Sequence, residues 1–343
     1  MLGMGRSSRP SFRIDSKDHA GKIRETENWF IDALEEWRIE KKIERFTLLG
    51  HSLGGYMAVC YALKYPGRLN KLILASPVGI PEDPNAVAEP LPDEGGRGGG
   101  DAEMEMDAEA GSDGKDNNNF LNARTSSSSN TATKPKPPVT RRLFNYLWDQ
   151  NVSVFSFVRW SGPLGPRLVS GWTSRRFGTL PTEEASALHD YSYSLFRQRG
   201  SGEYALGYVL APGAYARSPL IRRIGGVGRG EYVPSDVGPS IAAREGGSDK
   251  LAKVRESGIP IVFMYGSHDW LDVKGGHAAI EKLDAERAKA EAQGGNSREQ
   301  GTAKVLIVDK AGHHVYLDGD KEFNEMMLEE MRDTERRQQQ AQR

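Results

Sequence analysis

The stretch Phe46-Thr47-Leu48-Leu49-Gly50-His51-Ser52-Leu53-Gly54-Gly55 carries more structural information than any other part of this chain. An apolar run followed by a serine between glycines is typical of a strand, a sharp turn and a helix, with the serine at the apex. The backbone of such a serine is strained, and side chains two residues to either side would collide with neighbouring turns, which Gly50 and Gly54 avoid. The N–H of Leu53 would then point toward a developing oxyanion. The alternative is a glycine-rich turn without chemistry.

The segments around this turn predict an α/β fold with a parallel sheet. Residues 24–38 place their apolar side chains on one helical face, and residues 56–65 continue as a mostly apolar helix. Residues 71–75 form a short buried strand, so a strand, a helix and a strand follow one another within about thirty residues, which implies a right-handed crossover. Two more buried strands are expected at residues 259–265 and 305–308.

The composition changes sharply after the second strand. Residues 82–140 are poor in aromatic residues and rich in Gly, Asp, Glu, Asn, Ser and Pro, so they cannot bury enough apolar surface to fold. From residue 141 onward the chain is rich in both aromatic and basic residues. This composition is typical of a helical cap packed on the core, of a surface that contacts lipid, or of both. We therefore expect five regions: the N-terminal part of the core at 1–80, a disordered insertion at 82–140, a helical cap at 141–250, the C-terminal part of the core at 251–335 and a polar tail at 336–343.

Charge and cysteine content exclude several classes of protein. The 343 residues carry a formal net charge of −1, so no overall electrostatic attraction to nucleic acid is expected. The single cysteine, Cys60, excludes an internal disulfide framework and fits a buried structural thiol. No apolar run is long enough for a membrane span, and the N-terminus resembles neither a signal nor a transit peptide.

A serine nucleophile needs a general base and an orienting carboxylate, and both follow the late strands. The strand expected at 259–265 is followed by Gly266-Ser267-His268-Asp269-Trp270-Leu271-Asp272. The strand expected at 305–308 is followed by Asp309-Lys310-Ala311-Gly312-His313-His314. The carboxyl ends of parallel strands meet at one edge of the sheet, where sites on open sheets form. The sequence therefore predicts a serine, an acid and a histidine on three strand ends.

Two of these positions leave alternatives. We favour Asp269 as the acid, because its distance from the strand is the usual one, but Asp272 is a second candidate, and either could instead cap a turn. His313 follows the turn glycine directly, whereas His314 should face elsewhere and is expected to be structural. His51 flanks the serine and is expected to shape the pocket without transferring protons.

Several stretches of the chain resemble one group of α/β hydrolases, which implies an α/β-hydrolase fold with a helical cap. The stretches are residues 50–55, 61–66, 72–74, 79–81, 311–318 and 323–324. This group contains lysophospholipid acyltransferases and N-acyl-phospholipid lipases, the coactivator of triglyceride lipase, and mitochondrial cardiolipin-specific deacylases. Residues 264–272 are most similar to the cardiolipin deacylase branch. The resemblance covers residues 1–80 and 141–335.

The resemblance implies a serine hydrolase that deacylates phospholipids of the cardiolipin type. Ser52 would attack the acyl carbonyl, His313 would act as general base and then general acid, Asp269 would orient the imidazole, and the Leu53 N–H would bind the oxyanion. His313 and Asp318 match the group's H-x4-D signature, which is linked to acyl transfer. An acyl-CoA-dependent lysophospholipid acyltransferase is therefore the alternative, and a non-catalytic lipid-associated adaptor is a third.

The same resemblance implies a phospholipid substrate, a peripheral membrane surface and a mitochondrial location. The triad mechanism needs no metal or cofactor, and the net charge indicates no nucleic-acid partner. Residues 2–10 resemble the loop after the fourth strand of the group's sheet, so the first strands are expected upstream of Met1. The His-Gly turn with the second oxyanion donor would lie there too, and the loss of one donor costs about a hundred- to a thousandfold in rate. We therefore expect an incomplete chain with an unpaired sheet edge, an uncertain activity and an open oligomeric state.

Overall fold

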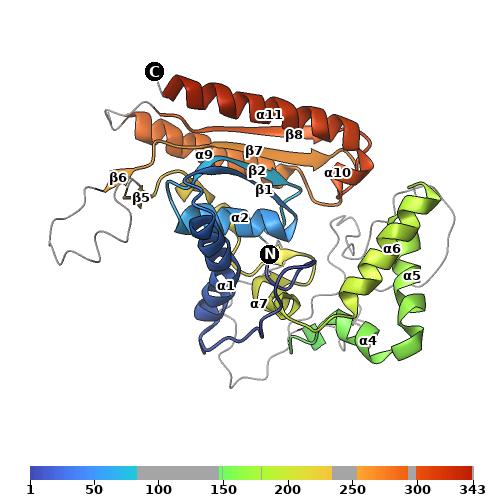
Figure 1. The fold of residues 1–343 in the computed structure, drawn as a ribbon. Coiled ribbons are helices and arrows are strands. Elements are labelled where there is room, and N and C mark those ends of the chain that lie inside the picture. Colours follow the sequence, from blue (N-terminus) through green and yellow to red (C-terminus); the bar gives the residue numbers. More distant parts are fainter. Residues whose placement is uncertain (83–146, 149, 179, 234–252, 293–298, 342–343) are drawn as a thin grey trace, which may run out of the picture. The chain divides into compact units, whose positions relative to one another are not determined.

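The computed structural model describes residues 1–82, 147–148, 150–178, 180–233, 253–292 and 299–341 (Figure 1). The chain divides into two compact units. Among the described residues, the helical unit consists of 1–30, 147–148, 150–178 and 180–217, and the sheet unit of 31–82, 218–233, 253–292 and 299–341. The long helix α1, His19–Glu40, belongs to both. The predicted insertion at 82–140 lies outside the described residues apart from Glu82.

A parallel sheet forms the centre of the sheet unit, as the sequence predicts. In the described part of the chain its strands lie in the order β1-β2-β7-β8. Their bounds are Phe46–His51, Leu69–Ala75, Pro260–Gly266 and Thr302–Val308. Every neighbouring pair is parallel, with Leu49 opposite Ile73 and Met264 opposite Leu306. The α/β fold class is confirmed. Strands β1, β2 and β8 are longer than the apolar runs that predicted them, and β7 has the predicted length but begins one residue later.

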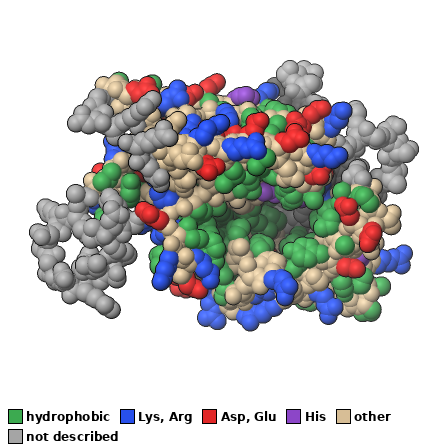
Figure 2. All heavy atoms as spheres, turned by 45° about the horizontal axis from the view of Figure 1, so that its top comes forward, with side chains coloured by type: hydrophobic (Ala, Val, Ile, Leu, Met, Phe, Trp, Pro, Cys, Tyr) green, Lys and Arg blue, Asp and Glu red, His purple; other side chains and the backbone are tan. Residues whose placement is uncertain are grey.

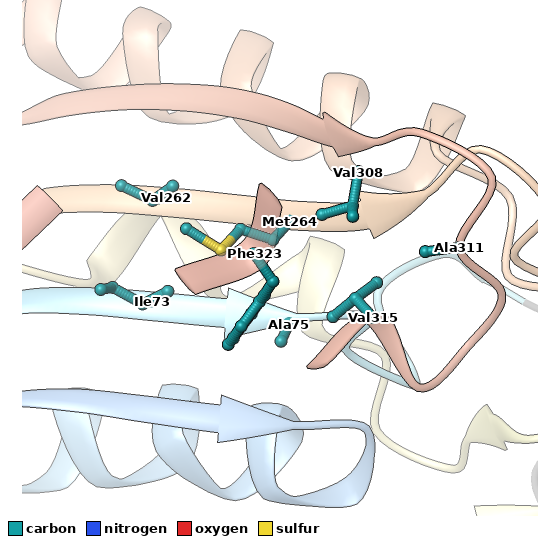
Figure 3. Packing of buried hydrophobic residues seen from close by; sticks show 8 residues of the cluster. All are labelled: Ile73, Ala75, Val262, Met264, Val308, Ala311, Val315 and Phe323. Carbon is teal, nitrogen blue, oxygen red and sulfur yellow. The ribbon is translucent and has the colours of Figure 1, made fainter. Parts of the chain in front are cut away.

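Alternation along the strands gives the sheet two buried faces. Ile73, Ala75, Val262 and Met264 point to one face, where they pack with residues of the C-terminal region (Figure 3). Those residues are Val308 at the end of β8, Ala311 in the loop after it, Val315 in helix α10, Val315–Asp318, and Phe323 in helix α11, Asp320–Ala341. The loop between β8 and α10 is thus fixed in the core at both ends, because Ala311 and Val315 are both fully buried.

The opposite face carries α2, Leu53–Lys64, and α9, Lys274–Ala292. Helix α2 buries a continuous run from Gly55 to Ala62. In α9, Gly276 is so close to the ring of Tyr265 that a Cβ would lie 2.8 Å from it. Helix α9 buries Leu283 and ends at Ala292, and residues 293–298 lie outside the described residues.

Short elements complete the sheet unit. The 3-10 helices η3, Leu220–Arg222, and η4, Ile224–Gly226, precede the antiparallel pair β5, Glu231–Tyr232, and β6, Val254–Arg255. The N–H of Leu220 donates to the carbonyl of Gly79 at 2.8 Å, and Leu220 and Ile224 are fully buried. The described residues 218–233 therefore group with the sheet, whereas we expected a cap that extends to residue 250.

The helical unit contains short helices and one two-stranded ribbon. Its elements are α4 Val154–Trp160, η1 Gly162–Leu164, α5 Gly165–Arg176, α6 Thr182–Phe196, η2 Gly202–Ala205, α7 Leu206–Val209, β3 Leu210–Ala211 and β4 Tyr215–Ala216. Residues 1–30 belong to this unit, whereas we expected them in the core. Among the described residues, no helix combines the length and apolar character that a membrane crossing needs.

The outer face of the sheet unit near α11 is charged. Lys, Arg, Asp and Glu side chains mix over this side of the molecule (Figure 2). The inner face of α11 carries Phe323, which is buried, with Met326 and Met327 packed against the core cluster. Helix α11 is therefore an amphipathic layer of the fold, and it continues to Ala341, through most of the region that we expected to be a polar tail.

Candidate active site

Ser52 lies at a strained turn between β1 and α2. Its φ of 54° and ψ of −119° are unusual for a residue with a side chain. The turn is fixed by backbone hydrogen bonds, because the Ser52 N–H donates to the carbonyl of Ala75 at 3.0 Å and the Gly55 N–H donates to that of Ser52 at 3.0 Å. The predicted strand, turn and helix are confirmed, and the serine occupies the strained position.

The glycines around Ser52 differ in their importance. A Cβ on Gly50 would lie 2.3 Å from the carbonyl oxygen of Gly54, so this position accepts only glycine. A Cβ on Gly54 would meet nothing within 4 Å, so the predicted collision at this position is wrong. Gly55 is the restricted position instead, because its Cβ would lie 2.8 Å from the side chain of Pro77. The turn after β2, which the sequence pattern does not reveal, imposes this restriction.

Ser52, His313 and Asp269 lie within hydrogen-bond distance of one another. His313 Nε2 is 3.0 Å from Ser52 Oγ, and His313 Nδ1 is 3.2 Å from Asp269 Oδ1. A carboxylate only accepts hydrogen bonds, so Nδ1 carries the proton of the neutral imidazole and Nε2 presents its lone pair to the serine hydroxyl. The side chains of His313 and Asp269 are buried, whereas Ser52 is half-buried.

The two candidate acids make different contacts. Asp269 Oδ1 also accepts from the backbone N–H of Leu271 at 3.0 Å, which fixes the carboxylate opposite the imidazole. Asp272 Oδ1 accepts from the N–H of Lys274 at 2.9 Å, at the start of α9, and is a turn-capping residue. The structure therefore brings Asp269, and not Asp272, to His313. Asp269 Oδ2 is buried and has no hydrogen-bond partner among the described residues.

The loops that carry the acid and the histidine are in direct contact. A Cβ on Gly266 would lie 2.1 Å from the carbonyl oxygen of Ala311, so glycine at the end of β7 is required for the approach. The ring of Trp270 lies 5.0 Å from that of His313. This contact was not predicted, although Trp270 directly follows the acid in the sequence.

Two further histidines, His51 and His314, pack around His313. His51 Nε2 lies 2.9 Å from the carbonyl oxygen of His313, and since that oxygen accepts, Nε2 carries a proton. The rings of His51 and His314 are 5.1 Å apart. His51 therefore contacts the backbone of His313 and lies beside the serine, as we expected of a residue that shapes the site. His314 Nδ1 is buried without a hydrogen-bond partner among the described residues.

The remaining predicted residues flank this group. Leu53 is the first residue of α2, where backbone N–H groups have no partner inside the helix. Asp318 Oδ2 accepts from the backbone N–H of Gly312 at 3.1 Å, one residue before His313. Among the described residues, no group of three or more His, Cys, Asp and Glu side chains could hold a metal ion. The arrangement is suited to acyl transfer through a covalent serine ester.

The comparison with protein families agrees with this geometry. A family model described as alpha/beta hydrolase fold matches residues 1–320. The chain belongs to this family. Among solved structures, MenH from S. aureus is 14% identical with a TM-score of 0.46, and the match covers 95% of this chain and 80% of that one.

Curated relatives of this α/β hydrolase carry acyltransferase names. The Arabidopsis thaliana protein named 1-acylglycerol-3-phosphate O-acyltransferase is 29% identical over 333 residues, which cover 95% of this chain and 57% of the relative. The human 1-acylglycerol-3-phosphate O-acyltransferase ABHD5 is 27% identical, with 96% and 67% covered. The Saccharomyces cerevisiae 1-acylglycerol-3-phosphate O-acyltransferase ICT1 is 23% identical, with 91% and 61% covered. The chain spans little more than half the length of the plant relatives it matches.

Proposed function

We propose that this α/β hydrolase transfers acyl groups through an ester on Ser52, with a lysophospholipid of the 1-acylglycerol-3-phosphate class as acceptor. The observation that carries the proposal is the position of His313, which lies 3.0 Å from Ser52 Oγ and 3.2 Å from Asp269 Oδ1. This geometry lets one imidazole remove the serine proton and later return it, while the carboxylate stabilises the imidazolium.

The reaction has two balanced halves. In the first, Ser52 Oγ attacks the carbonyl of an acyl-CoA, His313 Nε2 takes the hydroxyl proton, and the same proton leaves with the CoA thiol. In the second, the acceptor hydroxyl attacks the acyl-serine, His313 takes its proton, and the serine leaves with that proton. The Leu53 N–H donates to the oxyanion in both halves. With water as acceptor, the second half releases a free fatty acid.

The names of the relatives support acyl transfer over cardiolipin deacylation. The plant, human and yeast relatives are each named 1-acylglycerol-3-phosphate O-acyltransferase. Deacylation would be hydrolysis of the same acyl-serine by water, so it requires no additional catalytic residues. The adaptor alternative gains no support from the site, because Ser52 is present and in contact with His313. The mitochondrial location stays a prediction, since the relatives' names carry no compartment.

The test is an acyl-transfer assay with the full chain. Purified protein is incubated with labelled acyl-CoA and 1-acylglycerol-3-phosphate, and both phosphatidic acid and free fatty acid are measured. We expect the wild type and a Ser194→Ala control, which removes an exposed serine on α6, to form phosphatidic acid, and Ser52→Ala to form none. If the wild type forms free fatty acid but no phosphatidic acid, the transferase proposal is wrong and the protein is a hydrolase. Equal product from the wild type and Ser52→Ala would overturn both the transferase and the hydrolase assignments.

An exposed apolar face of the helical unit supports binding at a membrane surface. Large apolar side chains follow one another along α4, η1 and α5: Phe157 is 49% exposed, Trp160 73%, Leu164 62% and Leu168 55%. Residues 154–176 contain four arginines and no acidic residue; Arg159 is ion-paired with Glu203, and Arg167 and Arg175 are exposed. Exposed aromatic and aliphatic side chains beside arginines favour the interface of an anionic bilayer. A lipid acceptor would be found at that interface.

Vesicle flotation tests this surface. We expect the wild type to float with vesicles of phosphatidylcholine and phosphatidic acid, and a Trp160→Ala, Leu164→Ala double variant to float several-fold less. Leu328→Ala, which removes a similarly exposed leucine from α11, is the matched control and should float like the wild type. Equal flotation of all three proteins would exclude this face as the membrane contact.

A further inference from the structure

We propose that Asp318 is a positioning residue, which orients the loop of His313 through the backbone and takes no part in proton transfer. This inference rests on the proposed function, because it assigns the second member of the H-x4-D pair within that site. The pair would then be no separate acyl-transfer centre, and transfer and hydrolysis would depend on Asp318 to the same degree.

The nitrogens of His313 are already engaged by other residues. Nδ1 contacts Asp269 at 3.2 Å and Nε2 contacts Ser52 at 3.0 Å. An imidazole has only these two nitrogens, so a second carboxylate has no ring nitrogen left to orient or to exchange a proton with. A catalytic His–Asp pair of His313 and Asp318 would require one of these contacts to break.

One hydrogen bond of the Asp318 side chain fixes a peptide group. Its Oδ2 accepts from the N–H of Gly312 at 3.1 Å. The carbonyl of the same peptide, on Ala311, accepts from the N–H of His268 at 3.0 Å. Both polar groups of this peptide are therefore fixed: its carbonyl by His268, the residue before Asp269, and its N–H by Asp318 of α10. Its orientation sets the direction in which the chain enters His313.

Helix α10 brings the carboxylate to this peptide. The N–H of Asp318 donates to the carbonyl of His314 at 3.0 Å, which turns the chain back over the loop. Val315, one turn earlier, is fully buried in the core cluster (Figure 3). The side chain of Asp318 itself is exposed, so its loss should disturb the loop and leave the core intact.

The experiment compares three variants of the full chain: Asp318→Ala, Asp318→Asn and the control Asp320→Ala. Asn keeps an oxygen that accepts from the Gly312 N–H but lacks the charge. Asp320→Ala removes an exposed carboxylate two residues away. For each variant we measure labelling of Ser52 by a fluorophosphonate, hydrolysis of a p-nitrophenyl ester, and transfer to 1-acylglycerol-3-phosphate with its kcat and KM. Thermal unfolding monitors the fold.

We expect Asp318→Ala to lower labelling, hydrolysis and kcat of transfer by one common factor of about three to ten, which is the loss of one hydrogen bond. The KM for the acceptor should stay unchanged, and Asp318→Asn and Asp320→Ala should stay within about twofold of the wild type. A loss confined to transfer, or an Asn variant as poor as the Ala variant, would overturn the inference. If the wild type transfers no acyl group, the proposed function fails, while labelling and hydrolysis still test the role of Asp318.

Discussion

The backbone of Ser52 shows how a single residue can be positioned by its neighbours. Its φ of 54° is held by two backbone hydrogen bonds. The Ser52 N–H donates to the carbonyl of Ala75 in β2, and the Ser52 carbonyl accepts from the N–H of Gly55 in the first turn of α2. Only residues that leave room for this backbone can flank it. The sequence predicts the turn and the serine, because both follow from the pattern of glycines and the preceding apolar run. It does not predict which glycine is indispensable, since Pro77 lies 25 positions after Ser52 in the chain.

Gly50 and Gly54 should therefore respond in opposite ways to alanine. Gly50→Ala places a Cβ 2.3 Å from a carbonyl oxygen, so we expect loss of Ser52 reactivity together with a lower melting temperature. Gly54→Ala meets no atom within 4 Å and lies inside α2, so it should leave reactivity unchanged and stabilise the fold by about 0.5–1 kcal/mol. Fluorophosphonate labelling and thermal unfolding of both variants check this. Equal loss in both would contradict the assigned turn geometry.

Asp269 and Asp272 can be separated by the same substitution. Asp269→Asn keeps the size of the side chain but lets its amide donate toward Nδ1, which favours the wrong imidazole tautomer, so kcat should fall by about 10⁴ as in other serine triads. Asp272→Asn keeps the oxygen that caps α9 and should retain activity within about twofold. The kcat of ester hydrolysis is the measurement. A larger loss from Asp272→Asn than from Asp269→Asn would reverse the assignment.

At the scale of elements, a buried ion network joins α11 to the sheet. Lys71 in β2 is fully buried, and its Nζ lies 2.8 Å from both Glu330 Oε2 and Asp333 Oδ2. Lys304 in β8 lies 2.5 Å from the other oxygen of Glu330. The sequence predicts β2 from its apolar residues but gives no sign of this network, because its partners lie 259 and 262 positions later. Long-range contacts of this kind are set by tertiary packing, which a local pattern does not contain.

Lys71→Met should destabilise the protein through this network. The substitution keeps the aliphatic volume but leaves Glu330 and Asp333 without their shared cation, which costs about 3 kcal/mol for a buried pair. Lys304→Met, at a half-exposed side chain, should cost less than about 1 kcal/mol and is the control. Urea unfolding at neutral pH measures both. A loss under about 1 kcal/mol for Lys71→Met would show that α11 does not depend on this contact.

The same network should make stability depend on acid pH. Burial acts to raise the pKa of Asp333, but the hydrogen bonds from Lys71 and Arg337 outweigh it and lower the pKa from 3.8 to about 2. A depressed carboxyl pKa stabilises the fold above the unfolded value and loses this contribution as pH falls toward the folded one. The stability difference between wild type and Asp333→Asn should therefore shrink from about pH 5 to about pH 2. A difference that stays constant in urea unfolding across this range would contradict the assignment.

For the whole molecule, the sequence predicted the α/β class and the order of serine, acid and histidine along the chain. Both follow from local patterns, since each residue comes directly after an apolar strand run. The division into units was harder to predict. Residues 1–30 and 218–233 group by long-range contacts, such as the bond from Leu220 to Gly79, and not by composition. The helical unit nevertheless keeps the aromatic and basic character that its sequence indicates.

The central claim is that Ser52 is a nucleophile activated by His313. The most direct measurement is mass spectrometry of the full chain after reaction with a fluorophosphonate, followed by digestion to locate the adduct. We expect one adduct on the peptide that contains Ser52, none on that peptide in Ser52→Ala, and labelling at least a hundredfold slower in His313→Ala, which lacks the general base. A wild type that forms no adduct on this peptide, or equal labelling rates in the wild type and His313→Ala, would contradict the account.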